Sequence, residues 1–185
     1  QAMEKMFTDL ENEISNCNKC ILHSSRKNSI TGAGVVGADI MLIGEAPGAT
    51  EDERGEPFVG RSGQLLMQML ADIGISREKN LYITNTLKCR PPENRNPKAD
   101  ETKACKGYLD RQIELHNPKI IILVGNYACK YFLGNTAAIT KIHGTFIEHN
   151  GRILFPVFHP AAIMRTPSLK PLAIADFEKL YEYIN

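Results

Sequence analysis

Ile120-Ile121-Ile122-Leu123-Val124 is the stretch of sequence that decides the fold. Four of its five residues are β-branched, which favours a strand, and the absence of polar alternation indicates a strand buried on both faces. Residues 126–132 follow at once with helical spacing of their apolar side chains. A buried strand that leads directly into a helix is typical of an α/β protein with a parallel sheet.

Similar segments recur on both sides of this stretch. Strands are predicted at residues 40–43 and 81–84, and a hairpin at residues 145–158 turns at His149-Asn150-Gly151, because Asn-Gly is a strong hairpin signal. Helices are predicted over residues 4–16, 60–73, 97–116 and 169–183. We therefore expect a three-layer α/β/α fold with a central, mainly parallel four-stranded sheet. It forms one domain over residues 1–185, in which Gln1-Ala2 resembles a cloning scar before Met3.

The topology itself predicts where a ligand binds. In open α/β sheets, ligands occupy the crevice beyond the carboxyl ends of the strands. This rule points to residues 44–48, to Asn85, to Gly125-Asn126 and to His159-Pro160, which all follow predicted strands.

Composition restricts the class of protein. The net charge is +1 and 43% of the residues are hydrophobic, as in ordinary globular chains. No apolar run is long enough to cross a bilayer and no signal peptide opens the chain, so we expect a cytoplasmic protein without membrane contact. Residues 88–106 hold six basic and three acidic side chains, a patch that suits a phosphate backbone but also a solvated helix face.

Four of the five cysteines have the spacing of a metal centre. Cys17 and Cys20 form a C-x2-C pair, which lets two thiolates face one metal, and Cys89 and Cys105 follow later in the chain. The spacing leaves zinc and iron–sulfur both open, and a free pair with unrelated buried thiols is the plainer alternative. Cys129 falls in a predicted helix and is expected in the core.

Several motifs together resemble one family. Gly44-Glu45-Ala46-Pro47-Gly48, then Glu51-Asp52 and Pro57-Phe58-Val59-Gly60, are similar to the first motif of family 4 uracil-DNA glycosylases. Thr84-Asn85 with Cys89-Arg90-Pro91-Pro92, and Phe158-His159-Pro160, resemble the later motifs in order. The resemblance extends from Cys17 to the last helix. It implies hydrolysis of the N-glycosidic bond of deoxyuridine, uracil-containing DNA as the partner, and a [4Fe–4S] cluster on Cys17, Cys20, Cys89 and Cys105.

The resemblance also implies roles for single residues. Phe58 stacks on the extruded base and Asn85 reads its Watson–Crick edge, since an amide has donors and an acceptor. His159 donates a hydrogen bond to uracil O2 as negative charge develops there. Glu45 either positions the attacking water or accepts backbone N–H bonds within its loop, and the backbone amides around Ala46 and Gly48 are expected to hold uracil carbonyls or a phosphate.

A smaller group of residues is expected on the DNA itself: Arg90, His143, Ile163, Met164 and Arg165. Ile163 or Met164 is the predicted wedge that fills the gap left by the flipped base, with Arg165 near a phosphate. Ala161 and Ala162 depart from the family pattern, which usually has a serine and a bulkier residue there. The alternative function is a non-catalytic DNA-binding or polymerase-associated module, and in either case we expect a monomer.

Overall fold

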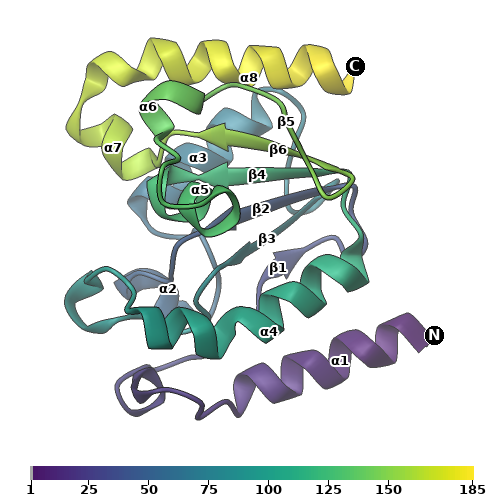
Figure 1. The fold of residues 1–185 in the computed structure, drawn as a ribbon, viewed down its shortest axis with the longest axis vertical. Helices are drawn as coiled ribbons and strands as arrows, with labels where there is room; N and C mark the ends of the chain where they lie inside the picture. The colour runs from purple at the N-terminus through teal and green to yellow at the C-terminus, as the bar shows by residue number, and fades with distance from the viewer. Residues whose placement is uncertain (1) are drawn as a thin grey trace.

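The computed structural model describes residues 2–185, so Gln1 of the predicted cloning scar lies outside the described residues. Its centre is a six-stranded sheet in the order β1-β3-β2-β4-β6-β5. The strands are β1 (Ala33–Gly34), β2 (Ile40–Gly44), β3 (Leu81–Asn85), β4 (Ile120–Val124), β5 (Ile147–His149) and β6 (Arg152–Val157). Figure 1 shows α8 next to β5 and β6, α4 on the side of β1 and β3, and α1 outside α4.

The mixed α/β class is confirmed, but the sheet has six strands and not the predicted four. The four inner strands β3, β2, β4 and β6 are parallel to one another. The outer strands β1 and β5 are short and antiparallel. Every residue of β2, β3 and β4 is buried, which explains why their sequences show no polar alternation.

The five longer helices lie close to their predicted ranges: α1 (Ala2–Ser15), α3 (Arg61–Ala71), α4 (Ala99–His116), α5 (Gly125–Leu133) and α8 (Lys170–Ile184). Three short helices were not predicted: α2 (Ala49–Arg54), α6 (Ile139–Ile142) and α7 (Pro160–Arg165). The short 3-10 turns η1 (Ile21–Ser24), η2 (Pro92–Asn94) and η3 (Pro167–Leu169) complete the chain. Segments this short span too few turns for apolar periodicity to show.

The predicted hairpin between β5 and β6 is confirmed. Asn150 and Gly151 both have positive φ, 50° and 79°, as a two-residue turn of the primed type requires. Among the helices formed by residues 2–185, none is both long enough and apolar enough to cross a bilayer.

The ring of His116 packs between the N-terminal helix and the sheet. It contacts Phe7 of α1 and Tyr82 of β3, with centroid distances of 4.4 and 3.9 Å. The Gly37 backbone N–H donates to His116 Nδ1 at 3.0 Å, while Nε2 is buried without a partner among the described residues. This burial lowers the pKa of His116 to about 4, so the ring stays neutral at physiological pH.

Candidate active site

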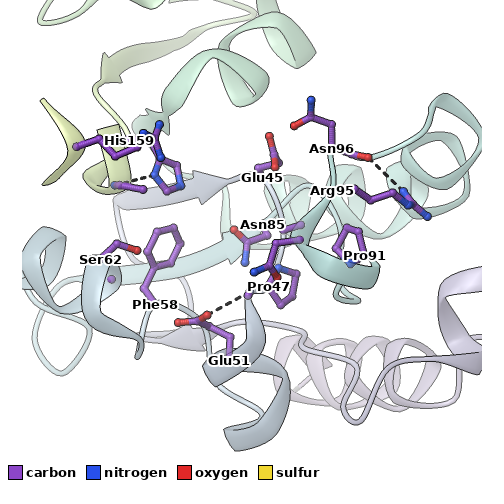
Figure 2. Close-up of a pocket in the computed structure, with 16 residues that line it drawn as sticks. Glu45, Pro47, Glu51, Phe58, Ser62, Asn85, Pro91, Arg95, Asn96 and His159 are labelled. Carbon is purple, nitrogen blue, oxygen red and sulfur yellow. Dashed lines mark hydrogen bonds between the residues drawn. The ribbon is translucent and has the colours of Figure 1, made fainter. Parts of the chain in front are cut away.

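The four parallel strands end at one edge of the sheet, and a cavity of about 480 Å³ opens there. Its volume lies in the range of small-molecule sites. All predicted catalytic and base-binding residues line it: Glu45, Ala46, Gly48, Phe58, Asn85 and His159. In Figure 2, Phe58 and His159 lie on one side, the loop of Pro91, Arg95 and Asn96 on the other, and Asn85 and Glu45 between them.

Asn85 and Phe58 meet at Gly44. A Cβ at position 44 would lie 2.5 Å from Asn85 Oδ1 and 2.6 Å from Phe58 Cζ, so only glycine leaves room for both side chains. Asn85 is 4% exposed, and no hydrogen bond within residues 2–185 engages its side-chain amide. An amide that lines a cavity without an internal partner has its donors and its acceptor available to a ligand.

A buried lysine donates a hydrogen bond to the backbone carbonyl of Asn85. Lys88 is 1% exposed, and its Nζ donates to Asn85 O at 2.7 Å, Thr84 Oγ1 at 2.7 Å and Gln112 Oε1 at 2.5 Å. Burial lowers the pKa of Lys88 to about 7, while the neighbouring Cys105 and Cys89 thiols, when ionised, favour its charged form. Lys88 therefore lies between the end of β3 and the thiols of Cys89 and Cys105.

His159 caps α7 in a way that fixes its tautomer. The Ala161 backbone N–H donates to His159 Nδ1 at 3.0 Å, so in the neutral ring the proton is on Nε2. Burial, assisted by the nearby positive charge of Arg165, lowers the pKa of His159 below its ordinary value. His159 therefore lines the cavity as a neutral imidazole whose Nε2–H is a hydrogen-bond donor.

Glu51, and not Glu45, accepts the backbone N–H bonds of the loop after β2. Glu51 Oε1 accepts from the Gly48 N–H at 3.1 Å, and its Oε2 accepts from the Val59 and Gly60 N–H groups at 3.0 and 2.6 Å. The Gly48 amide, one of those expected to hold a ligand, therefore donates to Glu51. No described residue donates to the Glu45 carboxylate, whose pKa is raised by burial.

Sequence reasoning missed Glu51 as a site-forming residue. It ties the loop after β2 to the segment that carries Phe58, because one carboxylate accepts three backbone N–H bonds from both. The signal was present in the Gly48-x-x-Glu51 spacing, which is that of a capping box at the start of α2.

The far wall of the cavity is a loop pinned by an ion pair. Arg95 donates from both terminal nitrogens to Glu101, at 2.8 and 2.6 Å. Glu101 is fully buried and also accepts from the Lys98 N–H at 2.9 Å, which fixes the start of α4. The Arg95 guanidinium is the first cause of the lowered pKa of Glu101. Such bidentate pairs set geometry as well as energy.

The residues predicted to contact DNA are not all brought together. Arg165 is exposed and lines the cavity, and Met164 next to it is partly exposed. Ile163 is 3% exposed and belongs to the main core, so its burial argues against the predicted wedge role. Arg90 lies outside the cavity lining, and its Nε donates to Asn94 Oδ1 at 2.8 Å.

His143 also lies outside the cavity, where a buried carboxylate holds it. Its Nδ1 lies 2.7 Å from Asp176 Oδ2 of α8, and its ring packs on Phe158 at a centroid distance of 4.4 Å. Gly144 is needed at the next position, because a Cβ there would lie within the space of the Asp176 carboxylate. Because the His143 ring packs on Phe158, it lies next to the segment that carries His159.

The four predicted metal ligands line one small cavity away from the site: Cys17, Cys20, Cys89 and Cys105. Arg26 Nη1 donates to Cys89 Sγ at 3.0 Å, and the Lys19 N–H donates to Cys17 Sγ at 3.5 Å. Burial raises the pKa of the Cys105 thiol to about 11. Within residues 2–185, no three His, Cys, Asp or Glu side chains are arranged to hold a single metal ion. Cys129 is fully buried in the main core, as predicted.

Known proteins match most of the chain in sequence. The model of the uracil DNA glycosylase superfamily matches residues 31–185. A type-4 uracil-DNA glycosylase of Sulfurisphaera tokodaii is 43% identical over 182 residues, which covers 94% of this chain and 82% of the relative. One of Archaeoglobus fulgidus is 41% identical over 182 residues, with 94% and 91% covered. A DNA polymerase of Bacillus phage SP01 is 37% identical over 149 residues, which are 80% of this chain and 16% of the polymerase.

Fold and site together define an α/β protein with a polar pocket at the carboxyl ends of its parallel strands. The matches make this class specific. The chain belongs to the uracil-DNA glycosylase superfamily and, within it, to the type-4 family, which confirms the predicted resemblance.

Proposed function

We propose that this protein removes uracil from DNA by hydrolysing the N-glycosidic bond of deoxyuridine, which leaves an abasic site for base excision repair. The observation that carries the proposal is the convergence of an unpaired Asn85 amide, the Phe58 ring and the His159 Nε2–H on one cavity. A flat ring with alternating acceptors and donors is the ligand that such a set recognises.

Discrimination against cytosine rests on Asn85. Its amide can donate to uracil O4 and accept from N3–H. Cytosine presents an amino group and an unprotonated N3 at these positions, so the same amide is mismatched on both. A buried polar mismatch rejects an analogue more strongly than shape does, and Asn85 is 4% exposed.

His159 assists departure of the base. Negative charge collects on uracil O2 as the glycosidic bond breaks, and a preorganised donor at that point contributes about 3–4 kcal/mol to the transition state. The Ala161 N–H to Nδ1 bond keeps the Nε2 proton available and holds the ring still. The lowered pKa of His159 keeps this neutral form dominant at physiological pH.

Glu45 is assigned to the attacking water. The loop N–H bonds that a structural carboxylate would accept are taken by Glu51, and the Glu45 carboxylate lines the cavity without a donor among the described residues. A free carboxylate can orient water and stabilise an oxocarbenium-like sugar.

DNA binding is assigned to the rim of the cavity. Flipping a nucleotide costs a few kcal/mol of lost stacking and pairing. Met164 is the remaining candidate for the wedge, since Ile163 is buried, and Arg165 beside it can reach a phosphate. Arg90 and His143 are secondary candidates for phosphate contacts.

The four-cysteine cavity fits the proposed [4Fe–4S] cluster. Its donors are four thiols, and Arg26, Lys19 and Lys88 supply the positive charge that a negatively charged cluster needs. When bound, the cluster supplies a structural cross-link and no step of the chemistry. Cys17 and Cys20 precede the sheet while Cys89 and Cys105 flank the pocket loop, so the cross-link would brace that loop from the N-terminal segment.

The proposal also includes the cellular compartment and the oligomeric state. None of the five cysteines forms a disulfide, which suits the proposed reducing cytoplasm. The enzyme is proposed to act as a monomer.

The direct test uses a labelled oligonucleotide with a single uracil, incubated with the protein and then treated with alkali. We expect cleavage at uracil but not at a matched cytosine. His159→Ala should lose roughly 100- to 1,000-fold in rate, and Asn85→Ala should lose activity and discrimination. His149→Ala, in the β5–β6 hairpin away from the cavity, is the matched control and should keep full activity.

Cluster content needs a separate measurement. Cys89→Ser should lose visible absorbance and melt at a lower temperature, while Cys129→Ala keeps the absorbance. An inactive wild-type protein with its absorbance intact would favour the alternative function, a non-catalytic DNA-binding or polymerase-associated module.

A further inference from the structure

Phe58 has an unusual backbone conformation. Its φ is +53°, and the other non-glycine residues with positive φ are Glu93 and three asparagines, all in turns or loops. The left-handed region is uncommon for a bulky side chain and is kept only where the surroundings enforce it. The ring of Phe58 lines the cavity at this point, so the conformation that costs energy is also the one that places the ring (Figure 2).

Two side chains hold this conformation from behind. Arg77, in the loop between α3 and β3, donates from Nη2 to Phe58 O at 3.1 Å. Glu51 accepts the N–H groups of the next two residues, Val59 and Gly60. The peptide that leaves Phe58 is therefore fixed at its carbonyl by a cation and at its N–H by a carboxylate.

The packing around Phe58 leaves little freedom for the ring. Gly63 permits the close approach of α3, since a Cβ there would lie 2.5 Å from Phe58 C and 2.6 Å from its Cα. At the tip, Gly44 leaves room for the ring beside Asn85. A return of Phe58 to the extended region would swing the ring out of the cavity.

Arg77 does not line the cavity itself. It is half-buried, and desolvation lowers its pKa, with Glu56 and Glu78 opposing that effect. Arg77 thus loses part of its hydration in order to donate to the Phe58 carbonyl. Its planar fork is suited to a fixed hydrogen bond in a partly buried place.

We propose that Arg77 is a positioning residue for base recognition: it holds Phe58 in the left-handed conformation that presents the ring to the flipped base. This inference rests on the proposed function. Arg77 acts only through Phe58, so its effect should vanish when the ring is absent.

The experiment is a double-mutant cycle with Arg77→Met and Phe58→Ala. Wild type, both single variants and the double variant are compared for kcat and KM on a single-stranded uracil oligonucleotide and for inhibition by free uracil. We expect Arg77→Met to lower kcat/KM and to weaken uracil inhibition by about tenfold, the scale of one lost base stack. In the Phe58→Ala background the same change should cost less than about twofold.

Three further variants serve as controls for the cycle, and the melting temperature shows whether each variant folds. Arg77→Lys should restore part of the uracil affinity, and Lys79→Met, an exposed cation two residues away, should change nothing. If Arg77→Met does not fold, Gly63→Ala displaces the same backbone and should show the same dependence on Phe58. Equal losses in both backgrounds, or unchanged uracil inhibition, would overturn the positioning role. An inactive wild type would instead contradict the proposed function.

Discussion

Gly44→Ala tests the geometry of the pocket with a single carbon atom. The added Cβ would lie 2.5 Å from Asn85 Oδ1 and 2.6 Å from Phe58 Cζ, whereas ordinary contacts begin near 3.4 Å. To reach 3.4 Å, the Asn85 amide must therefore move by about 0.9 Å from 2.5 Å and the Phe58 ring by about 0.8 Å from 2.6 Å. Gly44 has no positive φ, so the backbone itself accepts alanine.

The displacement sets the expected loss of activity. A misplacement of about 1 Å in a catalytic site costs roughly 100-fold, or about 2.7 kcal/mol of transition-state stabilisation. Overpacking a core position costs about 1–3 kcal/mol of folding stability. We expect kcat/KM on uracil-containing DNA to fall about 100-fold at a temperature where the variant is still fully folded.

Single-turnover cleavage and thermal melting measure the two effects separately. Gly107→Ala is the matched control, because a Cβ at this position in α4 meets no atom within 4 Å. It should raise stability by about 0.5–1 kcal/mol and leave activity unchanged. Full activity of Gly44→Ala would refute the inferred convergence of Asn85 and Phe58 on this glycine.

Three other predictions follow from charge. Burial raises the pKa of Glu45, so the acidic limb of the pH–kcat/KM profile should lie above the ordinary glutamate value of 4.5. Glu45→Gln should abolish that limb and cost roughly 100-fold at pH 8. His116 has a folded pKa of about 4 against 6.5 unfolded, so its stability contribution is complete above pH 6.5 and is lost as the pH falls toward 4. Melting curves from pH 7.5 to 4.5 should show a loss of roughly 2 kcal/mol that His116→Leu removes. Glu101→Gln should lower stability by about 2 kcal/mol and raise KM, because Arg95 releases the pocket loop. Asp110→Asn, which breaks an exposed pair, should change the melting temperature little; equal effects would contradict the assignment.

The strands and the strand-end residues were predictable from sequence for a physical reason. Fully buried parallel strands appear as continuous apolar runs, and their carboxyl ends must meet at one edge of the sheet. Asn85 and His159 were therefore expected close together before any contact was known, and both line the cavity. Cys129 was expected in the core because it falls in the helix after the central strand, and it lies there.

What escaped prediction depends on contacts between distant segments or on very short elements. Arg77 reaches back 19 positions to the Phe58 carbonyl, and nothing in its neighbourhood in the sequence indicates this. β1 has only two residues and no apolar run, so it was not predicted, whereas β5 was predicted as an arm of the hairpin but was not counted among the four strands of the sheet. Ile163 was proposed as a wedge from its place after His159-Pro160, but α7 turns that side chain inward.

The buried face of α4 has a consequence for how the molecule opens. Glu101, Cys105, Gln112 and His116 follow one another along this face, and they support in turn the pocket loop, the cysteine cavity, the strand end at Asn85 and the N-terminal helix. Cooperative unfolding of the whole helix α4 would release all four regions together. Their backbone amides should therefore share one protection free energy in hydrogen exchange, as a single cooperative unit. On heating, the pocket and the N-terminal helix would then unfold in one cooperative step.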